Sequence, residues 1–158
     1  MDFQRWGYRI SLLICCFMSV AYAGGTGTSP IRRIEITKAE SQVPRMSAEE
    51  LKAKLSRNEA VTILDVRATA SYVNSTTRIK GSIHVKLRRL EFRLTLPPLR
   101  DVPRDSEVIT YCACPHDEAS IRAAQILIDA GFKRVHVLDG GWQAWLRANG
   151  QVEARPKA

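Results

Sequence analysis

The sequence VITYCACPHDEASIRAAQILIDAG, residues 108–131, contains a strand pattern, a cysteine-bearing loop and a helix pattern in direct succession. Val108 to Cys112 is a short apolar run typical of a buried, central strand. From Ala119 to Ala130 apolar residues recur at helical spacing, and Gly131 is a residue that ends helices. The expected buried face of this helix consists of Ile121, Ala124 and Ile128. A buried strand that leads directly into an amphipathic helix is the repeating unit of α/β folds.

The segments on either side repeat the same alternation of strand and helix. Short apolar strands are expected at residues 61–64, 81–85 and 135–138. Helices are expected after the capping residue Ser47, through the leucines of residues 87–94 up to Pro97, and at residues 141–148. These elements predict an α/β fold with a single, mostly parallel central sheet and helices on both faces. The folded domain is expected to span residues 46–150, with a frayed tail at residues 151–158.

The N-terminal residues have the pattern of a secretory signal peptide. Arg5 and Arg9 precede an apolar run at residues 10–20, and Ala21-Tyr22-Ala23 provides a small-residue cleavage site. We therefore expect a signal peptide at residues 1–23 and export, to the periplasm of a bacterium; the alternative is an uncleaved anchor. Residues 24–45 are expected to be a linker with a possible edge strand from Ile31 to Thr37.

The composition restricts the function classes. The chain has 158 residues and a formal charge of +8, with 45% hydrophobic and 25% charged residues, as in ordinary globular domains. Aromatic residues make up 7%, and no nucleic-acid-binding motif accompanies the positive charge, so nucleic acid is not an expected partner. Contact with a membrane is expected only through an uncleaved signal. Signal cleavage would remove Cys15 and Cys16, which leaves only Cys112 and Cys114.

The loop from Cys112 to Glu118 is the candidate active site, because in such folds the chemistry lies beyond the carboxyl ends of the strands. A loop between a buried strand and a helix directs backbone N–H groups at one point, and the helix N-terminus adds a partial positive charge. A thiol at this place ionises more readily than an ordinary cysteine, and a thiolate attacks sulfur well. The pair of thiols favours this reading over that of a buried cysteine that serves only as a small apolar side chain.

Four segments, in order, resemble the rhodanese-domain family of sulfurtransferases. They are residues 47–51 with ILDVR at 63–67, RIKGSIH at 78–84, Tyr111-Cys112 with residues 123–132, and VLDGGWQAW at 137–145. The resemblance implies that one cysteine takes sulfane sulfur from a small donor as a persulfide and passes it to a thiol or protein acceptor. It implies no metal and no organic cofactor. The loop amides would stabilise the anionic intermediate.

The loop departs from the family pattern CxxGxRS, whose Gly and Arg are missing here. Cys112 keeps the usual position at the end of the strand, whereas Cys114 keeps the usual spacing to Ala123-Ala124; we favour Cys112 as the nucleophile. The expected substrate-binding residues are Ala113, Pro115, His116, Asp117, Glu118 and Ala119. The carboxylates of Asp117 and Glu118 are expected either to cap the helix or to repel a dianion, which predicts weak turnover of thiosulfate. A phosphatase or arsenate reductase needs C-x5-R, which neither cysteine provides.

Two other functions stay open at this point. The Cys-x-Cys pair could close a redox-active disulfide or, with His116, bind a soft metal ion such as Cu(I). The domain could also be a rhodanese-like binding module without catalysis. Asp65 and Arg67 are interpreted as a charge pair at the end of a strand. The basic residues Lys86, Arg88, Arg89 and Arg93 are interpreted as a solvated face, with attraction of an anionic partner as the alternative.

Overall fold

The computed structural model describes residues 43–156. The expected signal peptide at residues 1–23 and the possible strand from Ile31 to Thr37 lie outside the described residues. The sheet strands are β1 (Arg45–Met46), β2 (Val61–Asp65), β4 (Ile83–His84), β5 (Glu107–Tyr111) and β6 (Arg134–Leu138). The α-helices are α2 (Ala48–Ser56), α3 (Thr69–Val73), α4 (Leu90–Arg93), α5 (Glu118–Asp129) and α6 (Gly141–Arg147). Two 3-10 turns, Leu87–Arg89 and Leu99–Asp101, flank α4. No helix among residues 43–156 is long and apolar enough to span a membrane.

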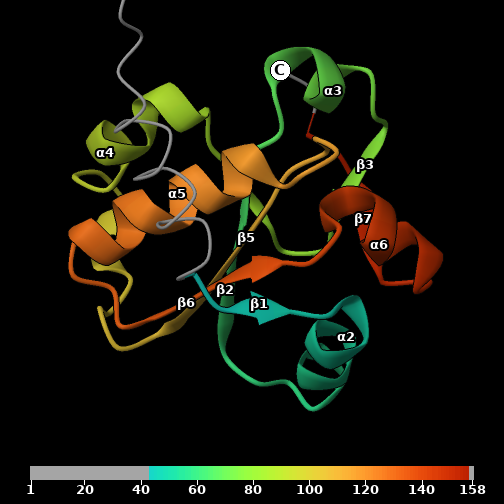
Figure 1. The fold of residues 1–158 in the computed structure, drawn as a ribbon, viewed down its shortest axis with the longest axis horizontal. Coiled ribbons are helices and arrows are strands. Elements are labelled where there is room, and N and C mark those ends of the chain that lie inside the picture. Colours follow the sequence, from blue (N-terminus) through green and yellow to red (C-terminus); the bar gives the residue numbers. More distant parts are fainter. Residues whose placement is uncertain (1–42, 157–158) are drawn as a thin grey trace, which may run out of the picture.

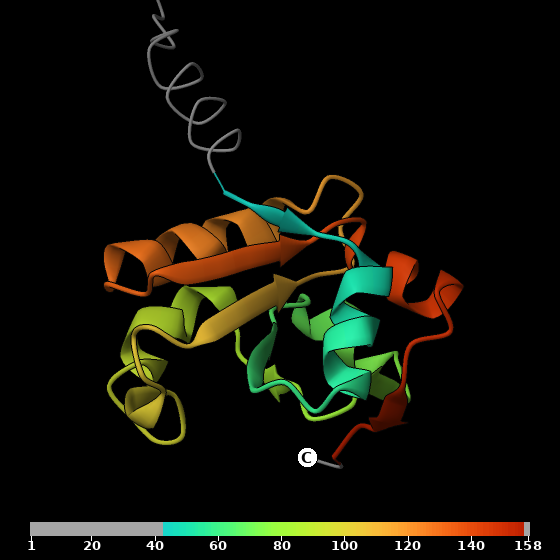
Figure 2. The same ribbon diagram turned by 90° about the horizontal axis from the view of Figure 1, so that it is seen from below.

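The five strands form one parallel sheet in the order β1-β6-β5-β2-β4. In Figure 2 the arrows of β1, β6 and β5 run side by side in the same direction. Strand β5 is fully buried and lies in the middle, with β2 and β6 as its neighbours. The prediction of a mostly parallel central sheet is therefore confirmed, although its middle strand ends at Tyr111 and not at the predicted Cys112. All loops that follow the carboxyl ends of these strands meet at one edge.

Helices cover both faces of the sheet, as predicted, because the strands alternate apolar side chains between two sides. Figure 1 shows α4 and α5 together on one side of the sheet, with α2 and α6 on the other. One apolar cluster, the α4–α5 cluster, contains Leu64, Leu90, Val108 and Leu127. The opposite α2–α6 cluster contains Leu51, Ile63, Ile109 and Trp145. Helix α2 begins as predicted, with the Ser47 hydroxyl accepting a hydrogen bond from the Glu50 N–H at 3.0 Å.

Helix α5 differs from the sequence prediction in the residue that completes its buried face. Ile121 and Ala124 are buried as expected, but Ile128 is 38% exposed. Leu127 is buried instead, with 1% exposure, and packs into the α4–α5 cluster. Positions three and four residues after Ala124 lie on either side of the same stripe, so sequence spacing permits both and the packing partners select Leu127.

The C-terminal segment is ordered, so the prediction of a frayed tail at residues 151–158 is wrong for its described part. Strand β7 (Val152–Ala154) pairs antiparallel with β3 (Thr77–Ile79) in a second, two-stranded sheet. The guanidinium of Arg78 pairs with Glu153 at 2.7 Å. Just before β7, the Gln151 carbonyl accepts a hydrogen bond from the Trp145 indole N–H. A short, polar strand has no apolar signature in the sequence; β3, more than 70 residues away, and the nearby Trp145 stabilise it.

Candidate active site

The cysteine loop connects the end of β5 at Tyr111 to the start of α5 at Glu118. Its first residue, Cys112, is 1% exposed. The Cys112 carbonyl accepts a hydrogen bond of 2.8 Å from the backbone N–H of Trp142 at the start of α6. A side chain on Gly141 would collide with this same carbonyl, and Gly141 has a φ of +48°. The glycine therefore allows α6 to approach the loop and fix the backbone of Cys112.

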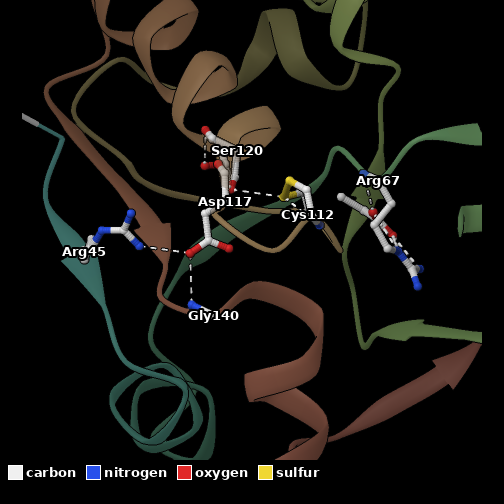
Figure 3. The surroundings of a disulfide bond; sticks show 9 residues. Arg45, Arg67, Cys112, Asp117, Ser120 and Gly140 are labelled. Atoms are coloured by element: carbon white, nitrogen blue, oxygen red, sulfur yellow. Dashed lines mark hydrogen bonds and ion pairs between the residues drawn. A yellow bond between two sulfur atoms is a disulfide. The ribbon is translucent and has the colours of Figure 1, made fainter. Parts of the chain in front are cut away.

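Cys112 and Cys114 are joined by a disulfide, with their Cα atoms 5.7 Å apart (Figure 3). Two hydrogen-bond donors lie close to the sulfur of Cys112: the backbone N–H of Cys114 at 3.4 Å and the hydroxyl of Ser120 at 3.6 Å, whose single proton also has the Asp117 carbonyl as an acceptor at 2.8 Å. Ser120 is buried in the first turn of α5. Both donors, together with the partial positive charge of the helix N-terminus, would stabilise a negative charge on this sulfur once the disulfide is reduced. The sequence did not single out Ser120.

Asp117 closes the loop in a left-handed backbone conformation, with φ of 55°, that aspartate tolerates. Its Oδ2 accepts hydrogen bonds from the Arg45 guanidinium at 2.9 Å and from the Gly140 N–H at 3.0 Å. The Asp117 side chain is 5% exposed. Figure 3 shows Arg45 and Gly140 on the side of Asp117 that faces away from the disulfide. The carboxylate thus ties the loop to β1 and to the start of α6, and a role of Asp117 in binding substrate stays a prediction.

The other expected substrate-binding residues lie in different surroundings. Ala113 is half-buried against the α2–α6 cluster, whereas Cys114 and Ala119 pack against the α4–α5 cluster. Pro115 and His116 are exposed at the tip of the loop. Glu118 is exposed in the first turn of α5, where a carboxylate interacts favourably with the helix dipole. Among residues 43–156, no three His, Cys, Asp or Glu side chains are grouped so that they could hold a metal ion.

A buried polar network supports the loop from below. The Arg67 guanidinium pairs with Asp65 at 2.7 Å, which agrees with the pairing expected from the sequence. The same guanidinium stacks over the ring of Trp142 at 4.4 Å. The Tyr111 hydroxyl donates a hydrogen bond of 2.8 Å to the same oxygen, Asp65 Oδ2. The ends of β2 and β5 and the start of α6 are thereby held together under Cys112.

Opposing effects set the pKa values in this network. Burial alone would raise the pKa of Asp65, but hydrogen bonds from His84, Arg67 and Tyr111 outweigh it and place that pKa below its ordinary value. Burial, followed by the negative charge of Asp65, raises the pKa of Tyr111. Asp65 is therefore ionised and Tyr111 neutral at neutral pH, while Arg67 Nη1 is buried without a hydrogen-bond partner.

A basic pocket of about 390 Å³ lies beside the loop. It is lined by Val66, Arg67, Ala68, Thr69, Lys86, Leu87, Arg88, Ala119 and Arg122. No acidic residue lines it. Lys86 and Arg88, which were interpreted as part of a solvated face, meet Arg122 of α5 here. The residues of this pocket come from three separate segments, so only the attraction of an anion, and not the pocket, could be anticipated from the charge pattern.

Comparison with known proteins agrees with this architecture. Residues 47–148 match the family described as Rhodanese-like domain. The thiosulfate sulfurtransferase GlpE of Vibrio cholerae is 49% identical over 41 residues, which span 26% of this chain and 39% of that protein. GlpE of Stutzerimonas stutzeri is 33% identical over 89 residues, covering 56% of this chain and 73% of that protein. The crystal structure of thiosulfate sulfurtransferase from Pseudomonas aeruginosa aligns with a TM-score of 0.62 and 32% identity, covering 78% of this chain and 22% of that one.

Proposed function

Because this chain belongs to the rhodanese-like domain family, we propose that it is a sulfurtransferase that carries sulfane sulfur as a persulfide on Cys112. The observation that supports this assignment most directly is the pair of donors on the Cys112 sulfur, the N–H of Cys114 and the hydroxyl of Ser120. They stabilise the thiolate that attacks and the persulfide anion that results.

The first half-reaction requires the reduced loop. The Cys112 thiolate attacks the outer sulfur of a donor such as thiosulfate, and the sulfur–sulfur bond of the donor breaks. Sulfite leaves with the electron pair of that bond, and the sulfane sulfur stays on Cys112 as a persulfide anion. In the second half-reaction an acceptor nucleophile, such as cyanide or a thiolate, takes the outer sulfur and restores the Cys112 thiolate.

The basic pocket is the proposed binding place for an anionic donor or acceptor. Lys86, Arg88 and Arg122 supply positive charge beside Ala119, and Arg45 neutralises Asp117, so Glu118 is the carboxylate of the loop that stays free to repel an anion. Weak turnover of thiosulfate nevertheless stays our prediction, for a second reason. In the disulfide form Cys112 has no free thiolate, and thiosulfate turnover therefore depends on prior reduction.

Export to an oxidising compartment is the second part of the proposal. It rests on the signal pattern at residues 1–23 and is supported by the adjacent thiols joined as a disulfide, a state that persists in the periplasm and not in a reducing cytosol. Expression in a bacterium, followed by fractionation and N-terminal sequencing, should recover a periplasmic chain that begins at Gly24. A chain retained in the cytosol with residues 1–23 intact would contradict export.

The function is tested with the reduced protein and two substitutions. Wild type and Cys114→Ser should both release sulfite from thiosulfate, and Cys114→Ser should gain one sulfur atom on the tryptic peptide 105–122, whose cysteines in wild type are Cys112 and Cys114 alone. Cys112→Ser should do neither. Persulfide formation by Cys112→Ser but not by Cys114→Ser would show that Cys114 is the nucleophile. If no variant gains sulfur from thiosulfate or from glutathione persulfide, the domain is not a sulfurtransferase.

A further inference from the structure

The two sulfurs of the Cys-x-Cys pair differ in their surroundings. Cys112 is buried, and its sulfur is the one that receives the hydrogen bonds of Cys114 and Ser120. Cys114 is only partly buried and packs against the α4–α5 cluster, as do Leu87 and Ala119, which line the basic pocket. The pair therefore combines a buried Cys112 sulfur, stabilised by hydrogen bonds, with a partly exposed Cys114 sulfur on the pocket side of the sheet.

We propose that Cys114 resolves the persulfide of Cys112, so that the domain reduces sulfane sulfur to hydrosulfide and ends in the disulfide form. This activity rests on the proposed persulfide at Cys112 and goes beyond transfer to an external acceptor. The Cys114 thiol attacks the inner sulfur of the persulfide anion. The Cys112–Cys114 disulfide forms, the bond to the outer sulfur breaks, and hydrosulfide leaves with the proton of Cys114. Two cysteine thiols are oxidised and one sulfane sulfur is reduced.

The loop geometry favours this intramolecular step. Trp142 holds the carbonyl of Cys112, and Arg45 with Gly140 holds Asp117, so the segment between these two residues is fixed at both ends. The Cα atoms of the two cysteines are 5.7 Å apart, within the usual range for a disulfide, and the bond closes with the ends of the loop in place. Two groups held at such a distance react far faster than the same groups free in solution.

A reductant must then return the Cys112–Cys114 disulfide to two thiols. The difference in exposure between the two sulfurs indicates which of them it attacks. An external thiolate attacks Cys114, the more accessible sulfur, and Cys112 leaves as the thiolate that Ser120 and the N–H of Cys114 stabilise. A second external thiol then releases Cys114. Over the whole cycle one thiosulfate and two thiols give sulfite, hydrosulfide, one disulfide and a proton. The basic pocket suits an anionic thiol such as glutathione.

A single turnover of the fully reduced protein with one equivalent of thiosulfate, without an acceptor, tests the inference. Wild type should release sulfite and hydrosulfide in equal amounts, and peptide 105–122 should lose two hydrogen atoms. Cys114→Ser should release the same sulfite, retain the added sulfur and give at least about ten-fold less hydrosulfide. Sulfite release from wild type with a persulfide that stays intact would overturn the resolving step while the proposed sulfurtransferase activity stands.

The reverse reaction separates the two proposals, because it needs no sulfur donor. Hydrosulfide added to the disulfide form should open it; attack at Cys114 competes, but only attack at Cys112 reverses the resolving step, so part of the added sulfur should be found on Cys112, with Cys114 free to react with an alkylating agent. This result would support the resolving step even if thiosulfate and glutathione persulfide both fail as donors. A disulfide that resists hydrosulfide but opens with glutathione would contradict it, as would added sulfur found only on Cys114.

Discussion

Replacing Asp117 with alanine should destabilise the domain and loosen the cysteine loop. The carboxylate accepts hydrogen bonds from Arg45 and Gly140 and is 5% exposed. Loss of the bond to the partly buried Gly140 N–H costs about 1–2 kcal/mol. Arg45 is 42% exposed and keeps its second partner Asp139, so that ion pair adds only about 0.5 kcal/mol. Alanine in a left-handed conformation adds about 1 kcal/mol.

The expected total for Asp117→Ala is therefore about 3 kcal/mol in the free energy of unfolding, or a fall in Tm of about 10 °C for a domain of this size. Asp117→Asn is the matched control, because asparagine tolerates the left-handed conformation and its carbonyl can still accept the Gly140 N–H. It removes only the charge that pairs with Arg45, and about 0.5 kcal/mol should be lost.

Urea unfolding monitored by tryptophan fluorescence measures both variants, since Trp142 and Trp145 lie in the core. The rate at which hydrosulfide opens the disulfide provides a second readout on the loop itself. An alanine variant that unfolded within about 0.5 kcal/mol of wild type would contradict the role of Asp117 in holding the loop. An asparagine variant as unstable as the alanine variant would contradict it as well.

Three further outcomes test the pocket, the buried network and the second sheet. Arg122→Ala should raise the KM for thiosulfate about four-fold, as expected for one partly screened charge, whereas Arg89→Ala, outside the pocket, should not; equal KM values would contradict the pocket assignment. The pKa of Asp65 is lowered by folding, so its contribution to stability is complete above about pH 4 and is lost as the pH falls through the folded pKa. The free energy of unfolding, measured between pH 3 and about pH 6, should therefore fall on acidification, and it should fall less in Asp65→Asn. A chain that ends at Gly150, without residues 151–158, should lose about 2 kcal/mol with β7, and an unchanged melting curve would show that β7 contributes nothing.

The layers of the fold could be predicted because each main element has a local apolar pattern. The runs in β2 and β5 and the helical spacing in α5 are complete within a few residues of sequence. Strands β3 and β7 have no such pattern, since their pairing joins Thr77–Ile79 with Val152–Ala154 and includes a polar Arg78–Glu153 contact. The choice of Leu127 over Ile128 likewise depends on neighbours that only the folded chain brings together.

The candidate site was predictable in position but not in its contacts. The two cysteines follow a buried strand and precede a helix, which a single sequence makes visible. The roles of Asp117 and Ser120 were not visible, because Arg45 lies 72 residues from Asp117 and because a serine in the first turn of a helix is common as a plain structural residue. The basic pocket depends on Arg122 meeting Lys86 and Arg88 across two elements.

The central place of β5 has a consequence for the exchange of backbone hydrogens with solvent. Every residue of β5 is paired with β2, and most are also paired with β6, so its amides should exchange only when the whole domain opens. The amide of His116, at the exposed tip of the loop, should exchange through small local openings. Cys112 thus lies at a boundary between slowly exchanging and rapidly exchanging residues. A boundary at this residue would let Cys114 leave and return during each redox cycle while Cys112 stays where the strand places it.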